Sequence, residues 1–287
     1  MSLETQIAAL VAAANSLTAT ISGKMGAIDD KVDAAVAVVP ATIRAEMTKT
    51  LYVDPAGSDA NSGTSWAAAK RTIRDAINSM PRGSSLLIYL KGGVIHEHAT
   101  TDIDLTAKVV QIIGDGHVYN DPATYAEIIA VPALLGDDSV WSPGMILGPR
   151  SFVGMTGVKI STAKLTAAHA GKAHPVWQTS FFKTMNGQGY VRMQHAKVDI
   201  FNGALMYQHT VGSIGLGDLM MRNVTINKVS LVGLPVTTGY QQMMGTYGVM
   251  AVPFSLYGVE MIRQGAANWG ELISADMSLA RTNLSLT

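Results

Sequence analysis

The sequence contains no cysteine, which excludes a disulfide framework and a metal site built on thiolates. No aromatic residue occurs before Tyr52, and Glu4 is the only charged side chain before Lys24. We therefore expect neither a secretory signal nor a membrane-spanning helix, since hydroxyl and amide side chains interrupt the apolar residues of this segment. Acidic and basic residues number 21 each, so the total charge gives no case for nucleic acid as a partner.

Acidic residues are also missing from one long internal stretch. Residues 139–198 contain no Asp or Glu but seven Lys or Arg, whereas residues 51–138 hold eleven acids against six bases. We expect uncompensated positive charge here, and a negative group from a ligand or a neighbouring chain close to it. An anionic glycan is one such partner, and the acidic surface of another protein is the alternative. The candidate binding residues are Lys183, Arg192, Lys197, Trp177, Tyr190 and Tyr207.

Residues 1–48 have the apolar pattern of a coiled coil. Apolar residues recur at spacings of four and three, and the pattern slips by one residue after Ile21, near Gly23 and Gly26. Pro40 is expected to end or kink the helix, with a short second helix over residues 42–48. A single amphipathic helix packed on its own domain is the alternative, but the small, Ala-rich seam favours association between chains. The residues expected to mediate it are Leu3, Ile7, Leu10, Leu17, Ile21, Met25, Ile28 and Val32.

Residues 49–287 show the pattern of many short strands separated by Gly, Asn, Asp or Pro. Residues 65–80 differ, because their apolar side chains recur at helical spacing and predict a short helix capping the strands. Four segments share a Val and an apolar residue two positions later: residues 157–160, 197–200, 223–226 and 258–261. Strand alternation predicts these side chains inside a solenoid, with a β-sandwich as the alternative.

The run Leu51-Tyr52-Val53-Asp54-Pro55-Ala56-Gly57-Ser58-Asp59-Ala60-Asn61-Ser62-Gly63-Thr64 resembles the opening of right-handed parallel β-helix domains of the pectate-lyase-like superfamily. The later elements Ala76-Ile77, residues 87–97 and residues 109–116 follow in the order typical of that family. The resemblance thus covers about residues 51–116. Such domains behind a helical segment resemble bacteriophage tail fibres and tailspikes, which are typically homotrimers anchored through their N-termini.

The resemblance implies a mainly β chain with a helical, virion-anchoring stalk at residues 1–48 and a parallel β-helix domain at residues 49–287. The implied function is that of a structural and receptor-binding subunit in the virion tail, which attaches to host surface glycan and binds other virion proteins through its N-terminus. A polysaccharide depolymerase and a structural adaptor for another fibre protein are the alternatives, since the fold does not decide activity. No cofactor, metal, nucleic acid or membrane insertion is expected.

Catalytic candidates are few. Glycoside hydrolysis needs two carboxyl groups across the scissile bond, and Asp102 with Asp104 is the best-spaced pair, because residues two apart on a strand share a face. Such proximity would raise the pKa of one carboxyl group. A solvated surface pair is the more common explanation. His96 and His98 share a face in the same way, but the sequence offers no third metal ligand.

Overall fold

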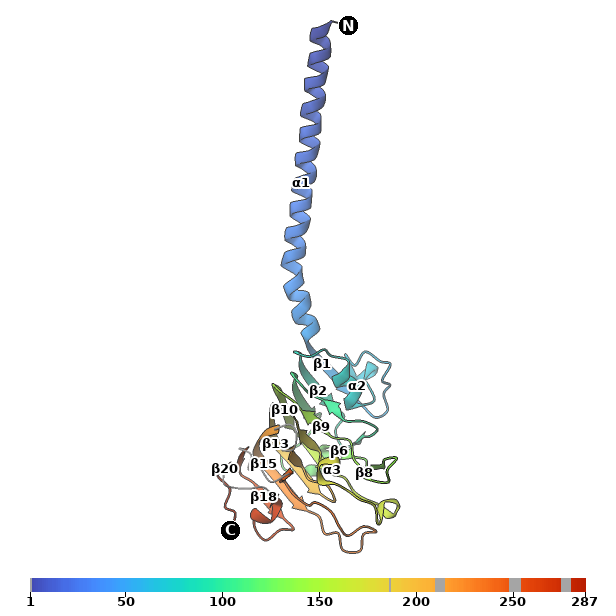
Figure 1. Ribbon diagram of the computed structural model, residues 1–287, viewed down its shortest axis with the longest axis vertical. Coiled ribbons are helices and arrows are strands. Elements are labelled where there is room, and N and C mark those ends of the chain that lie inside the picture. Colours follow the sequence, from blue (N-terminus) through green and yellow to red (C-terminus); the bar gives the residue numbers. More distant parts are fainter. Residues whose placement is uncertain (1, 186, 210–214, 248–253, 275–279) are drawn as a thin grey trace. The chain divides into compact units, whose positions relative to one another are not determined.

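The computed structural model describes residues 2–185, 187–209, 215–247, 254–274 and 280–287. The chain divides into two compact units, Met1–Thr48 and Lys49–Thr287. The first is helical, and the second is mainly β with long parallel sheets (Figure 1). Among the described residues, no helix combines the length and apolar character needed to cross a membrane.

The first unit is one helix, α1 (Leu3–Met47), which begins where the Ser2 hydroxyl accepts a hydrogen bond from the Thr5 amide. No residue of α1 is buried, and the eight seam residues are between 49% and 72% exposed. The helix runs through Pro40, so of the two expected effects, an end or a kink, the end is wrong, and no separate helix forms over residues 42–48. A proline removes one amide donor, while the hydrogen bonds of the turns on either side can persist.

The second unit contains, within the described residues, a 12-stranded and a six-stranded parallel sheet. We divide the larger sheet into two arms, which share the long strands β13 (Gly187–Ile200) and β15 (Gly215–Lys228). The first arm also holds β1 (Thr48–Val53), β2 (Ser85–Leu90), β5 (Val109–Gly114), β10 (Ser151–Thr156), β17 (Phe254–Val259) and β20 (Ala280–Thr282). The second arm adds β3 (Ile95–His98), β6 (Ala126–Ala130), β11 (Val158–Ser161) and β18 (Ile262–Gln264). The six-stranded sheet holds β4 (Ile103–Asp104), β9 (Met145–Leu147), β12 (Phe182–Thr184), β14 (Met206–His209), β16 (Met244–Tyr247) and β19 (Ile273–Ser274).

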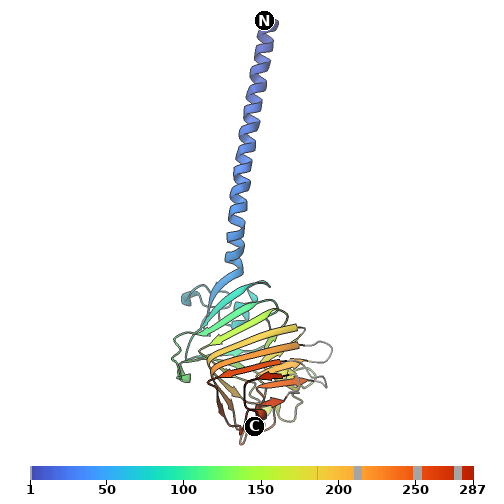
Figure 2. The ribbon, with the colours of Figure 1, turned by 90° about the vertical axis from the view of Figure 1, so that its left-hand side faces the viewer.

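The chain visits these three strand stacks repeatedly in the same order. It passes from β2 to β3 to β4, then from β5 to β6 to β9, and then from β10 to β11 to β12. Figure 2 shows the strands of the first arm as arrows stacked in chain order, from green to orange. This arrangement is consistent with a β-helix-like solenoid.

Alternate side chains of each strand face the core and meet in ladders along the stack. In the first arm one ladder consists of residues at most 1% exposed: Leu86, Val110, Val153, Val191, Leu219 and Leu256. In the second arm Ile128, Ile160, Val198 and Ile226 form another, each of them fully buried. Period-two alternation in the sequence therefore produces one continuous apolar core.

In the passes that contain β10, β13, β15 and β17, the two arms meet at one residue that has a positive φ angle. These residues are in register: Gly157 (65°), His195 (46°), Asn223 (53°) and Glu260 (54°). Left-handed backbone is unusual for residues other than glycine, so its repetition marks a fixed corner of the fold. The last predicted strand segment crosses this corner at Glu260, and Val259 is 52% exposed, so its expected position inside the solenoid is wrong.

Residues 65–80 form two short helical turns rather than one helix: η1 (Trp66–Ala68) and α2 (Ile73–Asn78). They are separated because Lys70 is extended and pairs with β1, its amide donating to the Tyr52 carbonyl at 3.0 Å. The remaining short elements are η2 (Pro122–Thr124), η3 (Ala167–His169), α3 (Val176–Thr179), η4 (Gly270–Leu272) and the antiparallel pair β7 (Ala133–Leu134) and β8 (Val140–Trp141).

Candidate functional site

The positive charge of residues 139–198 is largely neutralised within the chain. Parallel stacking places these bases beside acids from earlier passes or beside Asp199, so the expectation that the negative group must come from outside is wrong for four lysines. The pairs are Lys159 with Glu127 (2.9 Å) and Asp199 (3.3 Å), Lys197 with Asp199 (3.3 Å), Lys183 with Asp102 (2.8 Å) and Lys172 with Asp138 (2.6 Å). Arg150, Lys164 and Arg192 form no ion pair with the acids that the structure describes.

Lys183 and Tyr207 are buried, so their predicted role as surface ligands is wrong. The side chain of Lys183 is 5% exposed and Tyr207 is 2% exposed. Both project outward from the six-stranded sheet, where they lie in register on β12 and β14. Other segments cover that face: Trp141 lies against the Lys183 ammonium at 5.2 Å, and α3 contacts β14.

Two further candidates lie away from any shared binding face. Trp177 is in α3, half-buried, where the helix contacts β8 and β14. Lys197 lies on the second-arm half of β13, half-buried, with its ammonium held by Asp199. The structure therefore does not assemble the six predicted binding residues into one site.

Tyr190 and Arg192 do share an exposed face. They alternate with buried residues on the first-arm half of β13 and project outward beside a groove of about 440 Å³, which we call the Tyr190 groove. Strand register fixes the neighbours: Tyr190 lies beside Phe152 and Asp218, and Arg192 lies beside Met220. The lining residues are Phe152, Tyr190, Val191, Arg192, Asp218, Leu219, Met220, Ser255 and Tyr257.

The Tyr190 groove combines flat apolar rings with a few polar groups. Tyr190 and Tyr257 are each 42% exposed and Met220 is 54% exposed. Arg192 supplies guanidinium donors, and the Asp218 carboxylate, which accepts a hydrogen bond from Gln188 at 2.8 Å, supplies acceptors. Exposed aromatic surface next to a small number of charged groups is typical of ligand sites.

The sequence did not single out Phe152, Asp218, Met220 or Tyr257. Each lies between buried neighbours on its strand, as Tyr190 does, but the sequence has continuous apolar runs at Phe152-Val153 and Leu219-Met220-Met221 and does not show this alternation. Their meeting depends on the register between strands, for example Arg192 with Met220 and Met220 with Tyr257. That register is set by loops of different length, which the local pattern does not report.

The two catalytic candidates are each held by a cation. Asp102 accepts hydrogen bonds from the Gly144 amide (2.6 Å) and from Lys183 (2.8 Å), whereas Asp104 accepts them from Thr106 and Arg82. Burial would raise the pKa of Asp104, but the hydrogen bonds from Thr106 and Arg82 outweigh it and lower that pKa below its usual value. This direction is opposite to the raised pKa expected of a proton-donating carboxyl group.

His96 and His98 point into the core, where each is 3% exposed. Their Nε2 atoms lie within hydrogen-bond distance of the Lys91 carbonyl (3.0 Å) and the Gly144 carbonyl (3.1 Å). Burial lowers the pKa of His98 to about 4 and also lowers that of His96. The described residues contain no group of three or more His, Asp or Glu arranged to hold a metal ion.

Comparison with protein-family models, with curated proteins and with solved structures found no match to this chain. Two exposed features of the described residues can meet a partner: the Tyr190 groove and the seam of α1.

Proposed function

We propose that this chain is a fibre subunit of a bacteriophage tail that attaches the virion to a glycan on the host surface through the Tyr190 groove. The groove itself carries the proposal. Pyranose rings present C–H groups that pack against aromatic faces, and their hydroxyls pair with guanidinium and carboxylate groups. Tyr190, Tyr257, Arg192 and Asp218 offer both kinds of contact on one outward face.

The proposed scaffold is a right-handed parallel β-helix. The ordered return of the chain to three strand stacks supports it, as does the resemblance of residues 51–116 to the opening of pectate-lyase-like domains. A stack of parallel strands gives a rigid surface, which holds the rings of the groove in place before a ligand binds.

The proposed role of α1 is to join chains and to anchor them to the particle. Its seam residues, from Leu3 to Val32, are at least 49% exposed, and no described residue covers them. Association would bury this apolar row, and a heptad seam buries it against like helices. Three chains are proposed from the resemblance to tail fibres, because the seam alone does not set the number.

Binding to a panel of bacterial surface polysaccharides tests the attachment role. Tyr190→Ala and Tyr257→Ala should each weaken binding at least tenfold, because each removes a ring from the groove. Tyr119→Ala is the matched control, since Tyr119 is an exposed ring (54%) that does not line the groove. Equal binding by wild type and both groove variants would refute the proposal.

The same panel separates the alternatives. Shortened polysaccharide products after incubation would favour a depolymerase, although both Asp102 and Asp104 are engaged by cations. No binding to any polysaccharide, together with a stable complex with another virion protein, would favour a structural adaptor.

A further inference from the structure

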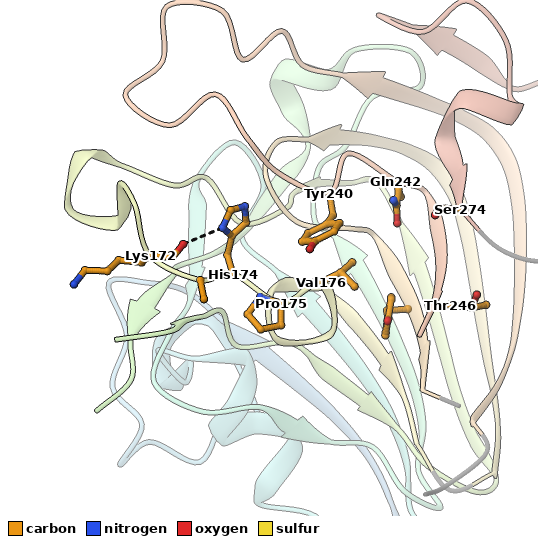
Figure 3. A pocket seen from close by; sticks show the side chains of 10 residues that line it. Lys172, His174, Pro175, Val176, Tyr240, Gln242, Thr246 and Ser274 are labelled. Atoms are coloured by element: carbon orange, nitrogen blue, oxygen red, sulfur yellow. Dashed lines mark hydrogen bonds between the residues drawn. The ribbon is translucent and has the colours of Figure 1, made fainter. Parts of the chain in front are cut away.

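A second cavity, which we call the Tyr240 pocket, lies over the outward face of the six-stranded sheet. It measures about 630 Å³, within the range of roughly 300 to 1,000 Å³ that is common for small-molecule sites. Three parts of the chain form its walls: the segment from Lys172 to Val176, the segment with Tyr240 and Gln242, and the strands β14, β16 and β19. Figure 3 shows these side chains around the pocket.

Aromatic rings form one side of the pocket. Tyr240 is 37% exposed, and the His174 ring lies edge-on to it, with centroids 5.8 Å apart and planes at 61°. The His174 Nδ1 atom lies 3.2 Å from the Lys172 carbonyl, which fixes the imidazole beside Tyr240 (Figure 3). The Tyr240 ring is therefore held at the pocket by its neighbours while keeping exposed surface for a ligand.

Neutral polar groups form the opposite side. To the right of Tyr240 in Figure 3 lie Gln242, Thr246 and Ser274. They supply an amide and two hydroxyls, and each of these groups can both donate and accept hydrogen bonds. Gly245 keeps this side open, because a Cβ atom there would lie 2.6 Å from the Gln242 Oε1 and 3.2 Å from the Tyr207 ring. Any larger residue at position 245 would occupy the space between the amide and the ring.

The pocket is nearly free of net charge. None of the described lining residues is Asp or Glu, and the one lysine, Lys172, is neutralised by Asp138 at 2.6 Å. The Lys172 side chain also points away from Tyr240 and Gln242 (Figure 3). A charged ligand would therefore lose its hydration without gaining an ionic partner in the pocket.

We propose that the Tyr240 pocket binds one neutral pyranose ring, with its C–H face on Tyr240 and its hydroxyls paired with Gln242, Thr246 and Ser274. The pocket shares no lining residue with the Tyr190 groove and lies on a different sheet. The inference therefore stands whether or not the groove attaches the particle to a host.

Saturation-transfer NMR with the full chain tests this directly. The probes are methyl α-D-glucopyranoside, methyl α-D-mannopyranoside, methyl β-D-galactopyranoside and N-acetylglucosamine, with N-acetylneuraminic acid as the charged comparison. At least one neutral probe should bind, and the acid should bind at least tenfold more weakly. Tyr240→Ala should weaken binding at least tenfold, whereas Tyr240→Phe, which keeps the ring face, should remain within about threefold of wild type.

Two controls make the outcome decisive. Tyr119→Ala, which removes an exposed ring that lines neither the pocket nor the groove, should leave binding of the neutral probe unchanged. If Tyr240→Ala does not fold, binding of the neutral probe is measured with Gln242→Leu, which removes the amide at similar volume and should also weaken binding. Absence of saturation transfer from all four neutral probes would overturn the proposal. So would binding that survives in folded Tyr240→Ala or, where that variant does not fold, in Gln242→Leu.

Discussion

Removing one partner of the buried ion pair between Lys183 and Asp102 should strongly destabilise the fold. The side chains are only 5% and 22% exposed, and the ammonium donates to Asp102 and to the Ser142 carbonyl, at 2.8 Å each. Burial lowers the pKa of Lys183 from its ordinary value, and the Asp102 carboxylate opposes this shift. Removing one partner of a buried pair costs about 3 to 5 kcal/mol, because the remaining charge is left without compensation.

Lys183→Met keeps most of the side-chain volume but removes the charge. Asp102 would retain its hydrogen bond from the Gly144 amide, so we expect the lower end of that range, about 3 kcal/mol. For a unit of this size, this corresponds to a fall in Tm of about 6 to 12 °C, measured by circular dichroism. Lys172→Met is the matched control: its ion pair is more exposed, so its loss should cost at most about 1 kcal/mol.

The double variant Lys183→Met/Asp102→Asn isolates the pair itself. Asparagine still accepts from the Gly144 amide but leaves no uncompensated charge, so the double variant should recover more than half of the loss in Tm. Two results would refute the reasoning. One is a loss of Tm of less than about 2 °C for Lys183→Met, and the other is a loss of Tm in the double variant that equals the sum of the losses in the two single variants.

Three further predictions concern His98, the seam of α1 and Arg192. Burial lowers the pKa of His98 to about 4, an effect that the Gly144 carbonyl and Asp102 oppose and that Lys183 and Arg74 reinforce. Because the unfolded chain takes up this proton near pH 6.5, stability should fall as pH drops from about 6.5 to about 4, by up to roughly 3 kcal/mol. Urea titrations of His98→Gln should show a flatter pH dependence, and an unchanged slope would contradict this. Ile7→Asp with Leu10→Asp should reduce the mass of the assembly in light scattering, whereas Glu4→Gln, outside the seam, should not. Arg192→Glu should weaken polysaccharide binding at least threefold, whereas Arg150→Glu, also exposed and outside the groove, should not.

Local features of the fold were largely readable from the sequence. Val158 and Ile160, which lie two positions apart, predicted a strand with one buried face, and the structure places both in the core. The apolar row of residues 1–48 likewise predicted a helix. Both signals depend on neighbours within a few residues, where side-chain periodicity reflects the backbone directly.

The register between strands of successive passes could not be predicted from the sequence. The predicted segments beginning at Gly157 and Lys197 were aligned with each other, but Gly157 is in register with His195. The shift arises because the common corner needs a left-handed residue, and four different residue types supply it. Because no residue type is shared at the corner, the sequence does not show which residues of successive passes are aligned.

Charge compensation depends on that register. Lys183 and Asp102 are 81 residues apart and Lys159 and Glu127 lie on neighbouring strands, so an acid-free stretch of sequence forms pairs with acids from other passes. Charge balance in such a fold must therefore be judged across strands and not along the chain. Charge reversal would break these pairs and also the pair within β13, since Lys197→Glu would place a second carboxylate beside Asp199. Arg192 is thus the only one of the three predicted bases whose reversal tests ligand binding without also breaking an ion pair among the described residues.

The difference between Arg192 and Lys183 also shows that a side chain pointing away from the core of a sheet is not necessarily exposed to solvent. Both side chains project away from the core of a parallel sheet, and each lies between two buried neighbours on its strand. Over the six-stranded sheet, Trp141 and α3 cover Lys183 and Tyr207. On the first arm, Tyr190, Met220 and Tyr257 remain at least 42% exposed. The connecting segments therefore decide which outward row can meet a ligand, and on this chain they leave the row containing Tyr190 available.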